Sequence, residues 1–479
     1  MNRLEHKSGE DPIIPLCRMV VGTEYDDLPG HVVDFAEKHL LDTVGATIGG
    51  SSGEMVSEIV GMVRAQGGKR QSVIPCYGYK VPAPLAAFAT GPMTRVLEIC
   101  DVHGGAGHTA DYVFPGLLAA TGLKKRVTGK EFIAAFVVGQ EVLIRIGTAC
   151  NQVSKGVPLG FAGGYKIFGA VGAVARLMGL TLEQTVNAMG IAGAMTQPHD
   201  LTMNSRHSQV PHVHHGFFCQ DAVTCCLVAQ MGIVGPHNIL MGGEGVEAGY
   251  FRQFCHWETD PSVLTRGLGR EWLMTGTTLK LFASGLANHT SVGAAIDLVR
   301  DNNIAPRDIS EIRVDLNTLG YKVQCLPREA KWNPQTHFEA RLSLPYVVAI
   351  GILDKKVLPD AFSDAARARQ DVRRVMEKVA ANEDPGLPSF GARVMIRLVD
   401  GTRYEKEAFV VKGHPDNPLS TDEIVSKFRG LMSYASFPIS AIAVNRLIER
   451  LLKLENVEDF GAEVVALLVP QTMQGVAAR

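Results

Sequence analysis

Acids and imidazoles gather around three glycines in the stretch EICDVHGGAGHTADY, residues 98–112. Glu98 and Asp101 lie three residues apart, and His103 and His108 follow them along the glycine-containing loop. Histidine exchanges a proton near neutral pH, and a carboxylate held beside it tunes its pKa. Glycines let such a loop approach a bound ligand closely. The pattern therefore indicates acid–base chemistry, with His108 as the general base or acid.

Three other interpretations of this stretch stay open. Asp101, His103 and His108 are acceptable metal ligands, although their spacing matches no familiar ligand signature. A phosphate-binding loop has little support, since neither GxxxxGK[ST] nor GxGxxG after a clear strand is present. A purely structural loop, whose Asp and His side chains cap helix ends, is the third interpretation.

A second group of imidazoles lies in QVPHVHHGFF, residues 209–218. Its histidines are His212, His214 and His215, three in four residues, which suggests a metal at first sight. No Cys, Asp or Glu within the motif completes a tetrahedral ligand set. The acid–base interpretation therefore assigns no metal to either segment, and a metal-binding protein stays an alternative.

Composition narrows the class of protein that carries these residues. At 479 residues the chain exceeds the usual size of a single core, so two domains are expected. A formal charge of −2 provides no overall attraction for nucleic acid or an anionic membrane, and we expect neither as a partner. The N-terminus lacks a secretory signal, and the nine cysteines include no CxxC pair. We expect a cytoplasmic protein whose anionic ligands are held by local basic groups.

Helical periodicity dominates the first 275 residues. In HVVDFAEKHLLDTVGATIGG, residues 31–50, apolar positions recur every three to four residues until Gly49-Gly50 ends the run. Two further segments, residues 130–150 and 169–195, are apolar nearly all round and rich in Gly and Ala. Such helices are buried among other helices, and small residues let them pack closely.

Alternating patterns replace the helical period beyond Gly276. Residues 311–319 and 392–411 alternate apolar and polar side chains, and Asp400-Gly401 marks a hairpin turn in the second segment. Residues 362–381 predict a surface helix with a basic face. A capping box, in which Ser420 and Glu423 each satisfy the other's backbone N–H, predicts the start of a helical tail.

The predicted fold is therefore mainly α. A large all-helical domain is expected to be discontinuous, formed by residues 1–275 and by a C-terminal tail, residues 413–479, that returns to it. Residues 276–412 are expected to form a smaller inserted α+β domain.

Several segments of the chain resemble conserved blocks of the MmgE/PrpD family. The family's signature loop runs H-x-x-D-x-x-D-T and closes with H-P, and Glu98, Asp101 and His108 fall on its two acids and its closing histidine. LLDTVGATIGG, KLFASGLANH, EARLSLPYVVA and GHPDNPLSTDEIVSKF resemble further family blocks in the expected order. The family includes 2-methylcitrate dehydratase, cis-aconitate decarboxylase and iminodisuccinate epimerase.

The chain also departs from the family pattern at positions close to the chemistry. Arg95 replaces the opening histidine of the loop, and Val102 and Thr109 replace its threonine and proline. In KLFASGLANH the family proline is Ala283, and the histidine of decarboxylase-like members is Gly285. A family lysine near residues 196–216 and an H-P element before the Gly/Ala-rich helix are also absent. The resemblance thus implies the fold but not the usual substrate.

The resemblance implies a cofactor-independent lyase of the dehydratase type that acts on a small di- or tricarboxylate. Such an enzyme removes a proton α to a carboxylate and releases the β-hydroxyl as water. Three alternatives remain: an epimerase of an iminodisuccinate-like dicarboxylate, a decarboxylase of an aconitate-like acid, and a non-catalytic metal- or ligand-binding paralogue. Family membership further implies a homodimer.

The resemblance also implies roles for individual residues. Lys280, near the expected domain boundary, would hold a substrate carboxylate and offset charge on an enolate-like intermediate. Tyr346 would be an active-site tyrosine, while Glu98 and Asp101 would orient His108 or complete a second proton transfer. Further basic residues are expected to bind the substrate's carboxylates: His103, Arg206, His212, His214, His289 and Arg341.

Overall fold

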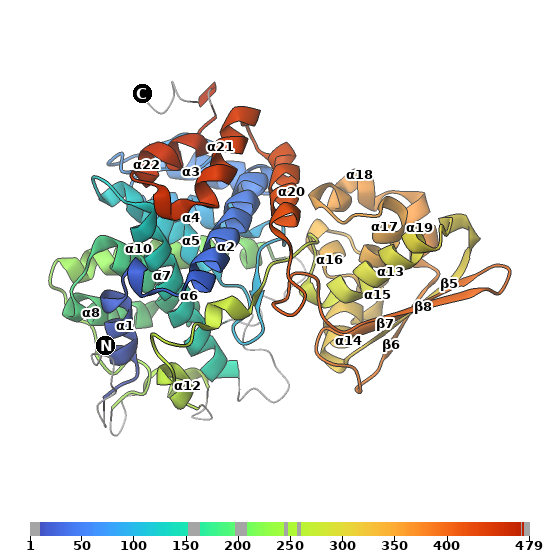
Figure 1. Ribbon diagram of the computed structural model, residues 1–479, viewed down its shortest axis with the longest axis horizontal. Coiled ribbons are helices and arrows are strands. Elements are labelled where there is room, and N and C mark those ends of the chain that lie inside the picture. The colour runs from blue at the N-terminus through green and yellow to red at the C-terminus, as the bar shows by residue number, and fades with distance from the viewer. Residues whose placement is uncertain are drawn as a thin grey trace. The chain divides into compact units, whose positions relative to one another are not determined.

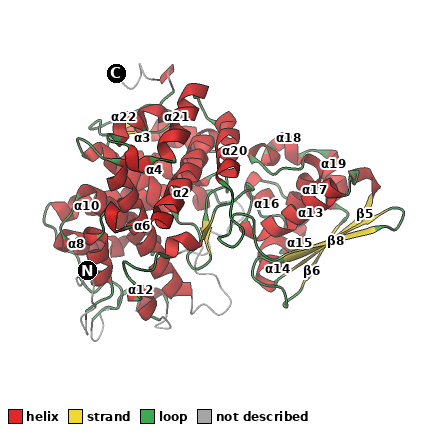
Figure 2. Ribbon diagram, viewed as in Figure 1, coloured by secondary structure: helices red, strands yellow, loops and turns green. Residues whose placement is uncertain are grey.

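The computed structural model describes residues 10–151, 163–196, 208–243, 248–255, 260–470 and 472–473, with the side chain of Asn151 left out. Helices predominate and strands are few and short, which confirms the mainly α class with a smaller α+β part (Figure 2). The chain divides into two compact units. The helical unit comprises Met1–Val96, Cys100–Thr277 and Ser420–Arg479, and the α+β unit comprises Leu97–Ile99 and Thr278–Leu419.

A layered bundle forms the centre of the helical unit (Figure 1). Helix α10 packs against α4, α5, α7 and α8, and α6 packs along α7. The bounds of the bundle helices are α4 Ala83–Arg95, α5 Ala110–Ala120, α6 Gly129–Asn151, α7 Lys166–Met178, α8 Leu182–Ala192 and α10 Val210–Gln230.

Small residues permit a close helix crossing between α4 and α10. A Cβ added at Gly91 would lie 2.5 Å from the backbone nitrogen of Gly216, and one at Gly216 would lie 2.4 Å from the carbonyl of Phe88. Neither position can carry a side chain without moving a helix. The crossing brings the last turn of α4 close to the histidines at the start of α10.

Helix α6 is long and apolar enough, by length and composition, to cross a membrane. In this structure 94% of its most apolar window is buried inside the fold, which is the environment of a core helix. Its buried charges, Glu141 and Arg145, form an ion pair of 3.0 Å.

The C-terminal segment packs on the second helix of the chain. Helix α20 (Thr421–Leu431) contacts α2 (Gly30–Gly49), and Lys427 Nζ lies 2.6 Å from Asp42 Oδ1, both side chains being buried. The predicted capping box is confirmed: Ser420 Oγ accepts from the Glu423 amide, and Glu423 accepts from the Ser420 amide. Helix α21 (Ala441–Leu451) follows.

A four-stranded sheet of order β6-β5-β7-β8 organises the α+β unit. Strands β5 (Ile309–Leu316) and β6 (Val379–Glu383) are parallel, whereas β7 (Ala392–Leu398) is antiparallel to both β5 and β8 (Arg403–Ala408). The predicted hairpin turn is confirmed between β7 and β8, where Gly401 has a φ of +90°. Helix α13 (His289–Asp301) packs on β7 and β8, and α17 (Leu344–Asp354) packs on α13.

The single surface helix predicted over residues 362–381 is wrong. The segment forms two short helices, α18 (Asp364–Arg367) and α19 (Gln370–Met376), and then enters β6. The break falls at Arg369, whose extended backbone is fixed by ion pairs of its guanidinium with Asp354 and Asp371. Val379 pairs with Ile312 in the sheet. These long-range partners override the local helical period.

Candidate active site

Asp101 fastens the start of helix α5. Its Oδ2 accepts from the amide of Thr109 at 3.2 Å and from the Thr109 hydroxyl, and its Oδ1 accepts from the Ala110 amide at 3.2 Å. A carboxylate at this position satisfies helix amides that have no partner within the helix. His39 Nε2 lies 3.5 Å from the same carboxylate. Burial alone would raise the pKa of the Asp101 carboxyl. The interactions with His39 and Thr109 outweigh burial and lower this pKa below its ordinary value, so the carboxyl stays ionised.

The backbone of Asp101, rather than its side chain, holds His108. The Asp101 carbonyl oxygen lies 2.8 Å from His108 Nδ1. Because a carbonyl only accepts, Nδ1 carries a hydrogen, so the lone pair of the ring in its neutral form is on Nε2. This is the tautomer in which a histidine with a fixed ring can act as a general base.

Asp111, on the first turn of α5, is the buried centre of the site. Its Oδ2 lies 3.2 Å from His215 Nε2, 3.6 Å from Arg95 Nε and 3.9 Å from His108 Nδ1. The Cys100 thiol donates to the same oxygen at 3.5 Å. Burial raises the pKa of the Asp111 carboxyl, and the nearby positive charges oppose that shift only in part.

Lys166 begins helix α7 and is fully buried. Its ammonium lies over the face of the Tyr112 ring, 4.4 Å from the ring centroid. Burial lowers the pKa of Lys166 to about 8, with Asp111 raising it and Arg95 lowering it further. The Tyr112 hydroxyl forms a 2.7 Å hydrogen bond with His214 Nε2. Burial, with help from His215 and Lys166, holds the pKa of His214 well below its ordinary value, so this imidazole is neutral.

Cys100, His108 and Asp111 also place three potential metal-ligand atoms within 4.8 Å of one another. Their chemistry fits a cation poorly. The imidazole nitrogen that faces this group, His108 Nδ1, already donates its hydrogen to the Asp101 carbonyl. Arg95 in addition places a permanent positive charge beside Asp111. These contacts favour acid–base chemistry over metal binding.

Within the α+β unit, Glu98 and Lys280 form a buried ion pair of 3.0 Å. Lys280 also donates to the carbonyl of Ser284 at 3.1 Å, and His289 Nε2 lies 3.4 Å from that carbonyl. Glu98 has a φ of +54°, in the left-handed region that side chains other than glycine adopt at a cost. Backbone strain of this kind is concentrated at functional sites.

The other sequence-predicted residues of the α+β unit have contacts in its interior. The Tyr346 hydroxyl donates to the carbonyl of Ala361 at 2.6 Å. The Arg341 guanidinium lies 5.2 Å from the centroid of the Phe362 ring. These contacts place both side chains in the packing of the unit, and their proposed roles toward a substrate stay predictions.

Three predicted anion-binding residues remain. His103 Nδ1 accepts from the Gly105 amide at 3.0 Å, and burial lowers the pKa of His103 to about 4. It is therefore neutral at physiological pH and contributes hydrogen bonds rather than charge. His212 is buried on the first turn of α10. Arg206 lies outside the described residues.

Sequence reasoning missed several residues that the structure gathers at the site. Arg95 was noticed only as a departure from the family pattern, and His215 only as part of a possible metal motif. Asp111 and Lys166 received no role. A signal was nevertheless present for Lys166, because a lysine inside the apolar run YKIFGAVGAVA is rarely buried without a function.

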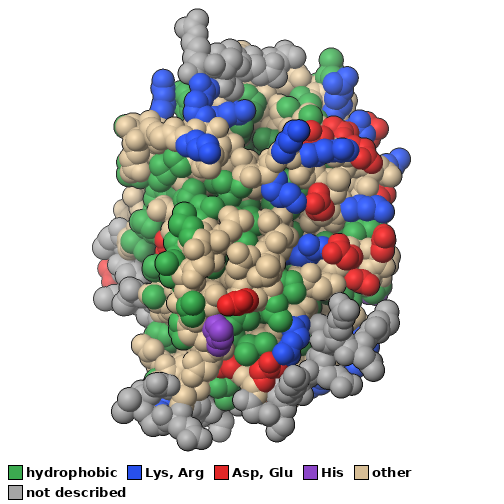
Figure 3. All heavy atoms as spheres, turned by 90° about the vertical axis from the view of Figure 1, so that its left-hand side faces the viewer, with side chains coloured by type: hydrophobic (Ala, Val, Ile, Leu, Met, Phe, Trp, Pro, Cys, Tyr) green, Lys and Arg blue, Asp and Glu red, His purple; other side chains and the backbone are tan. Residues whose placement is uncertain are grey.

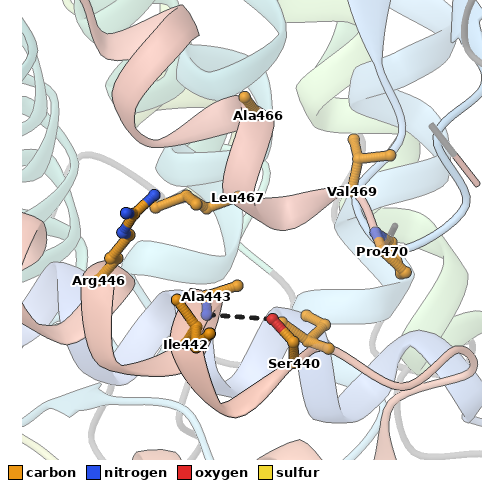
Figure 4. A pocket seen from close by; sticks show the side chains of 9 residues that line it. Ser440, Ile442, Ala443, Arg446, Ala466, Leu467, Val469 and Pro470 are labelled. Atoms are coloured by element: carbon orange, nitrogen blue, oxygen red, sulfur yellow. Dashed lines mark hydrogen bonds between the residues drawn. The ribbon is translucent and has the colours of Figure 1, made fainter. Parts of the chain in front are cut away.

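A small cavity of about 170 Å³ lies in the C-terminal segment of the helical unit (Figure 4). Among the described residues of its lining, Arg446 is the only charged one, and Ser440 accepts from the Ala443 amide. This described lining contains no acid or histidine for proton transfer. The remaining lining residues are Ile439, Ile442, Ala466, Leu467, Val469 and Pro470.

A buried histidine whose Nδ1 is bound to a backbone carbonyl, beside a carboxylate and two cations on a helical scaffold, is an arrangement suited to acid–base chemistry. Comparison with protein families also indicates an enzyme. The MmgE/PrpD N-terminal domain matches residues 15–256, and the MmgE/PrpD C-terminal domain matches residues 282–454. The chain belongs to the MmgE/PrpD family.

Similar proteins of known name cover almost the whole chain. The cis-aconitate decarboxylase-like protein oryM of Aspergillus oryzae is 27% identical over 95% of this chain and 96% of its own length. The cis-aconitate decarboxylases of Mus musculus and Homo sapiens are 24% and 25% identical, over 92% and 91% of this chain and 90% of their own lengths. These relatives support a lyase-type enzyme that acts on a carboxylate.

Proposed function

We propose that the protein is a cofactor-independent lyase that removes a proton α to a carboxylate of a small di- or tricarboxylate and releases a β-hydroxyl as water. The observation that carries this proposal is the 2.8 Å hydrogen bond from His108 Nδ1 to the Asp101 carbonyl. It leaves Nε2 as the basic nitrogen in a buried, polar site. A positioned general base contributes about 10²–10⁴-fold to the rate.

Lys280 is proposed to hold a substrate carboxylate and to offset the negative charge of the enolate-like intermediate. Its ion pair with Glu98 offsets part of the cost of burying both charges and fixes the position of the ammonium. The proton that the base removes is then delivered to the β-hydroxyl, which leaves as water; Glu98 is proposed as the group that takes up this proton and returns it in the second transfer. A hydrogen bond from an ammonium to a carboxylate contributes about 1.5–3 kcal/mol.

Decarboxylation is the second candidate, because the named relatives are cis-aconitate decarboxylases or resemble one. The position of Gly285 argues against it. Decarboxylase-like members of the family carry a histidine there, whereas a Cβ at Gly285 would lie 2.7 Å from Gln324 Nε2 and 2.8 Å from Leu342 Cδ2. The ends of the Gln324 and Leu342 side chains would have to move to admit a histidine.

Proton NMR in D₂O separates these reactions directly. The purified protein is incubated with citrate, 2-methylcitrate or cis-aconitate, and the products are followed over time. Formation or hydration of a double bond supports the lyase, release of CO₂ supports the decarboxylase, and deuterium uptake without loss of water supports an epimerase. Absence of all three, with a ligand shown to bind by thermal shift, would contradict the proposal.

We also propose a homodimer, for which the exposed face of α10 is suited. Val210 and Phe217 lie seven residues apart on α10, and Met231 lies fourteen residues further, directly after the helix; 40%, 52% and 79% of their surfaces are exposed. Helices α8 and α10 lie on the left of Figure 1, the side that faces the viewer in Figure 3. Hydrophobic side chains gather on one half of that face and charged ones on the other (Figure 3). Apolar surface of this kind is typical of an interface.

A cytoplasmic location is proposed as well. All nine cysteines are buried as free thiols, which suits a reducing compartment.

A further inference from the structure

Two cations from different helices converge on one buried carboxylate in the helical unit. Arg95, at the end of α4, lies 3.6 Å from Asp111 Oδ2, and the charge of Lys166, at the start of α7, acts on the same carboxylate. All three residues are at least 95% buried. A charge in such surroundings needs a partner to offset the loss of its water.

Lys166 is the less satisfied of the two cations. The Lys166 ammonium lies over the face of the Tyr112 ring, and among the residues that the structure describes it donates to no hydrogen-bond acceptor. Asp101, the other nearby acid, is already occupied by Thr109, Ala110 and His39. Asp111 is shared with Arg95, His215 and Cys100. The two acids equal the two cations in number, so the asymmetry of the site lies in their contacts: both carboxylates are engaged by other groups, whereas the Lys166 ammonium lies against the Tyr112 ring.

The Tyr112 ring beneath the Lys166 ammonium is itself held in place by two histidines. Tyr112 packs against His215 in a tilted arrangement, with ring centroids 4.0 Å apart, and its hydroxyl is hydrogen-bonded to His214 at 2.7 Å. The ring is thus fixed at one end by an imidazole and presents its face to the ammonium. A lysine over an aromatic face keeps its N–H donors available for a further acceptor.

We propose that Lys166 and Arg95 form an anion subsite that binds one carboxylate of the substrate. The identity of the anion as a carboxylate rests on the proposed function, whereas the existence of the subsite rests on the geometry. A carboxylate here would accept hydrogen bonds from the Lys166 ammonium and would place the carbon next to it close to His108. Both cations would then stabilise the negative charge that develops when His108 removes the proton.

Two anions test the subsite independently of turnover. Tricarballylate is a tricarboxylate without a hydroxyl group to lose, and sulfate is a small anion unrelated to the proposed reaction. Binding of each is measured by titration calorimetry to the wild type and to Lys166→Gln, Lys166→Arg and the control Lys130→Gln. Lys130 lies on α6 with its side chain half exposed. Circular dichroism establishes that each variant is folded.

Lys166→Gln is expected to weaken both anions at least tenfold, while Lys166→Arg and Lys130→Gln retain binding. Charged and titratable groups that act on Lys166 are Arg95, Asp101, Cys100, Asp111 and His214. The wild type should lose about tenfold in affinity per pH unit above pH 8 as the ammonium loses its proton, and Lys166→Arg should not. This comparison stands even if the glutamine variant fails to fold.

The binding of the two anions distinguishes failure of the subsite proposal from failure of the proposed function. Equal binding of tricarballylate to the wild type and to Lys166→Gln overturns the subsite and leaves the proposed function in place. Sulfate binding that depends on Lys166, without any binding of tricarballylate, supports the subsite and contradicts the carboxylate substrate. Binding of neither anion to the wild type overturns the subsite.

Discussion

His108 donates its Nδ1 hydrogen to the backbone carbonyl of Asp101, 2.8 Å away, while the Asp101 carboxylate secures the first turn of α5. One residue therefore fixes both the tautomer of the imidazole and the helix that follows it. The two functions are separable, because the first uses the backbone and the second uses the side chain. Changes at His108 should for this reason affect chemistry without unfolding the loop.

Replacement of His108 by Asn should lower kcat by about 10²–10⁴-fold while the protein stays folded. The amide side chain can still donate to the Asp101 carbonyl, but it provides no basic nitrogen. Product formation followed by NMR, with thermal unfolding in parallel, measures both effects. His31→Asn, at an exposed position on α2, is the matched control and should leave turnover unchanged. Full activity of His108→Asn would remove the general-base assignment.

The Glu98–Lys280 pair should show separate effects on stability and on activity. Lys280→Met leaves the Glu98 carboxylate buried without its partner, so it should destabilise the protein by about 3–5 kcal/mol and abolish turnover. The double variant Glu98→Gln/Lys280→Met should recover most of the stability in urea unfolding, because neither charge remains. It should recover no activity. A double variant with wild-type turnover would show that the pair is only structural.

Lys166 should make the stability of the protein depend on alkaline pH. Its pKa falls from 10.5 to about 8 in the folded protein, so between these values the folded state binds fewer protons than the unfolded state. Stability must then rise from pH 8 to 10.5, and the cost of the buried charge is fully present below pH 8. Lys166→Met should stabilise the protein at pH 7 by on the order of 3 kcal/mol and flatten this slope. Urea unfolding at pH 7 and 9.5, in buffer without multivalent anions, provides the measurement; an unchanged slope would contradict it.

Phe217→Glu should convert the proposed dimer into monomers. A carboxylate in the middle of the apolar face of α10 would have to be buried without a partner at the interface. Sedimentation equilibrium measures the mass of the particle. Met62→Glu is the control, since Met62 is also an exposed hydrophobic residue, at 46%, but lies on α3 (Val56–Gln66). If the wild type is itself monomeric, the dimer proposal fails.

Local patterns predicted the elements of this fold well. The apolar period of α2 stops at Gly49, the Asp400-Gly401 turn joins β7 to β8, and the capping box at Ser420 begins α20. Each of these features depends on residues only a few positions apart. The segment around Arg369 was mispredicted because its conformation is decided by Asp354, fifteen residues earlier, which no local window contains.

The site was predictable only where a motif marked it. His108 was recognised from its loop, but its partner is a backbone carbonyl, which no residue type reveals. Asp111, Lys166 and His215 belong to α5, α7 and α10, and their proximity depends on how closely those helices pack. The Gly91–Gly216 crossing that permits this packing joins residues more than a hundred positions apart. Both glycines are visible in the sequence, but the sequence does not show that they are in contact.

The ion pair between Asp42 and Lys427 has a consequence for how the chain is made. Its two residues are separated by 385 positions, and almost all of the α+β unit is translated between them. While the α+β unit is being synthesised, Lys427, the ion-pair partner of Asp42, does not yet exist. The surface of α2 that α20 later covers is then open to solvent or to a chaperone. Completion of the helical unit is therefore tied to the final stage of synthesis, and its folding is expected to be largely post-translational.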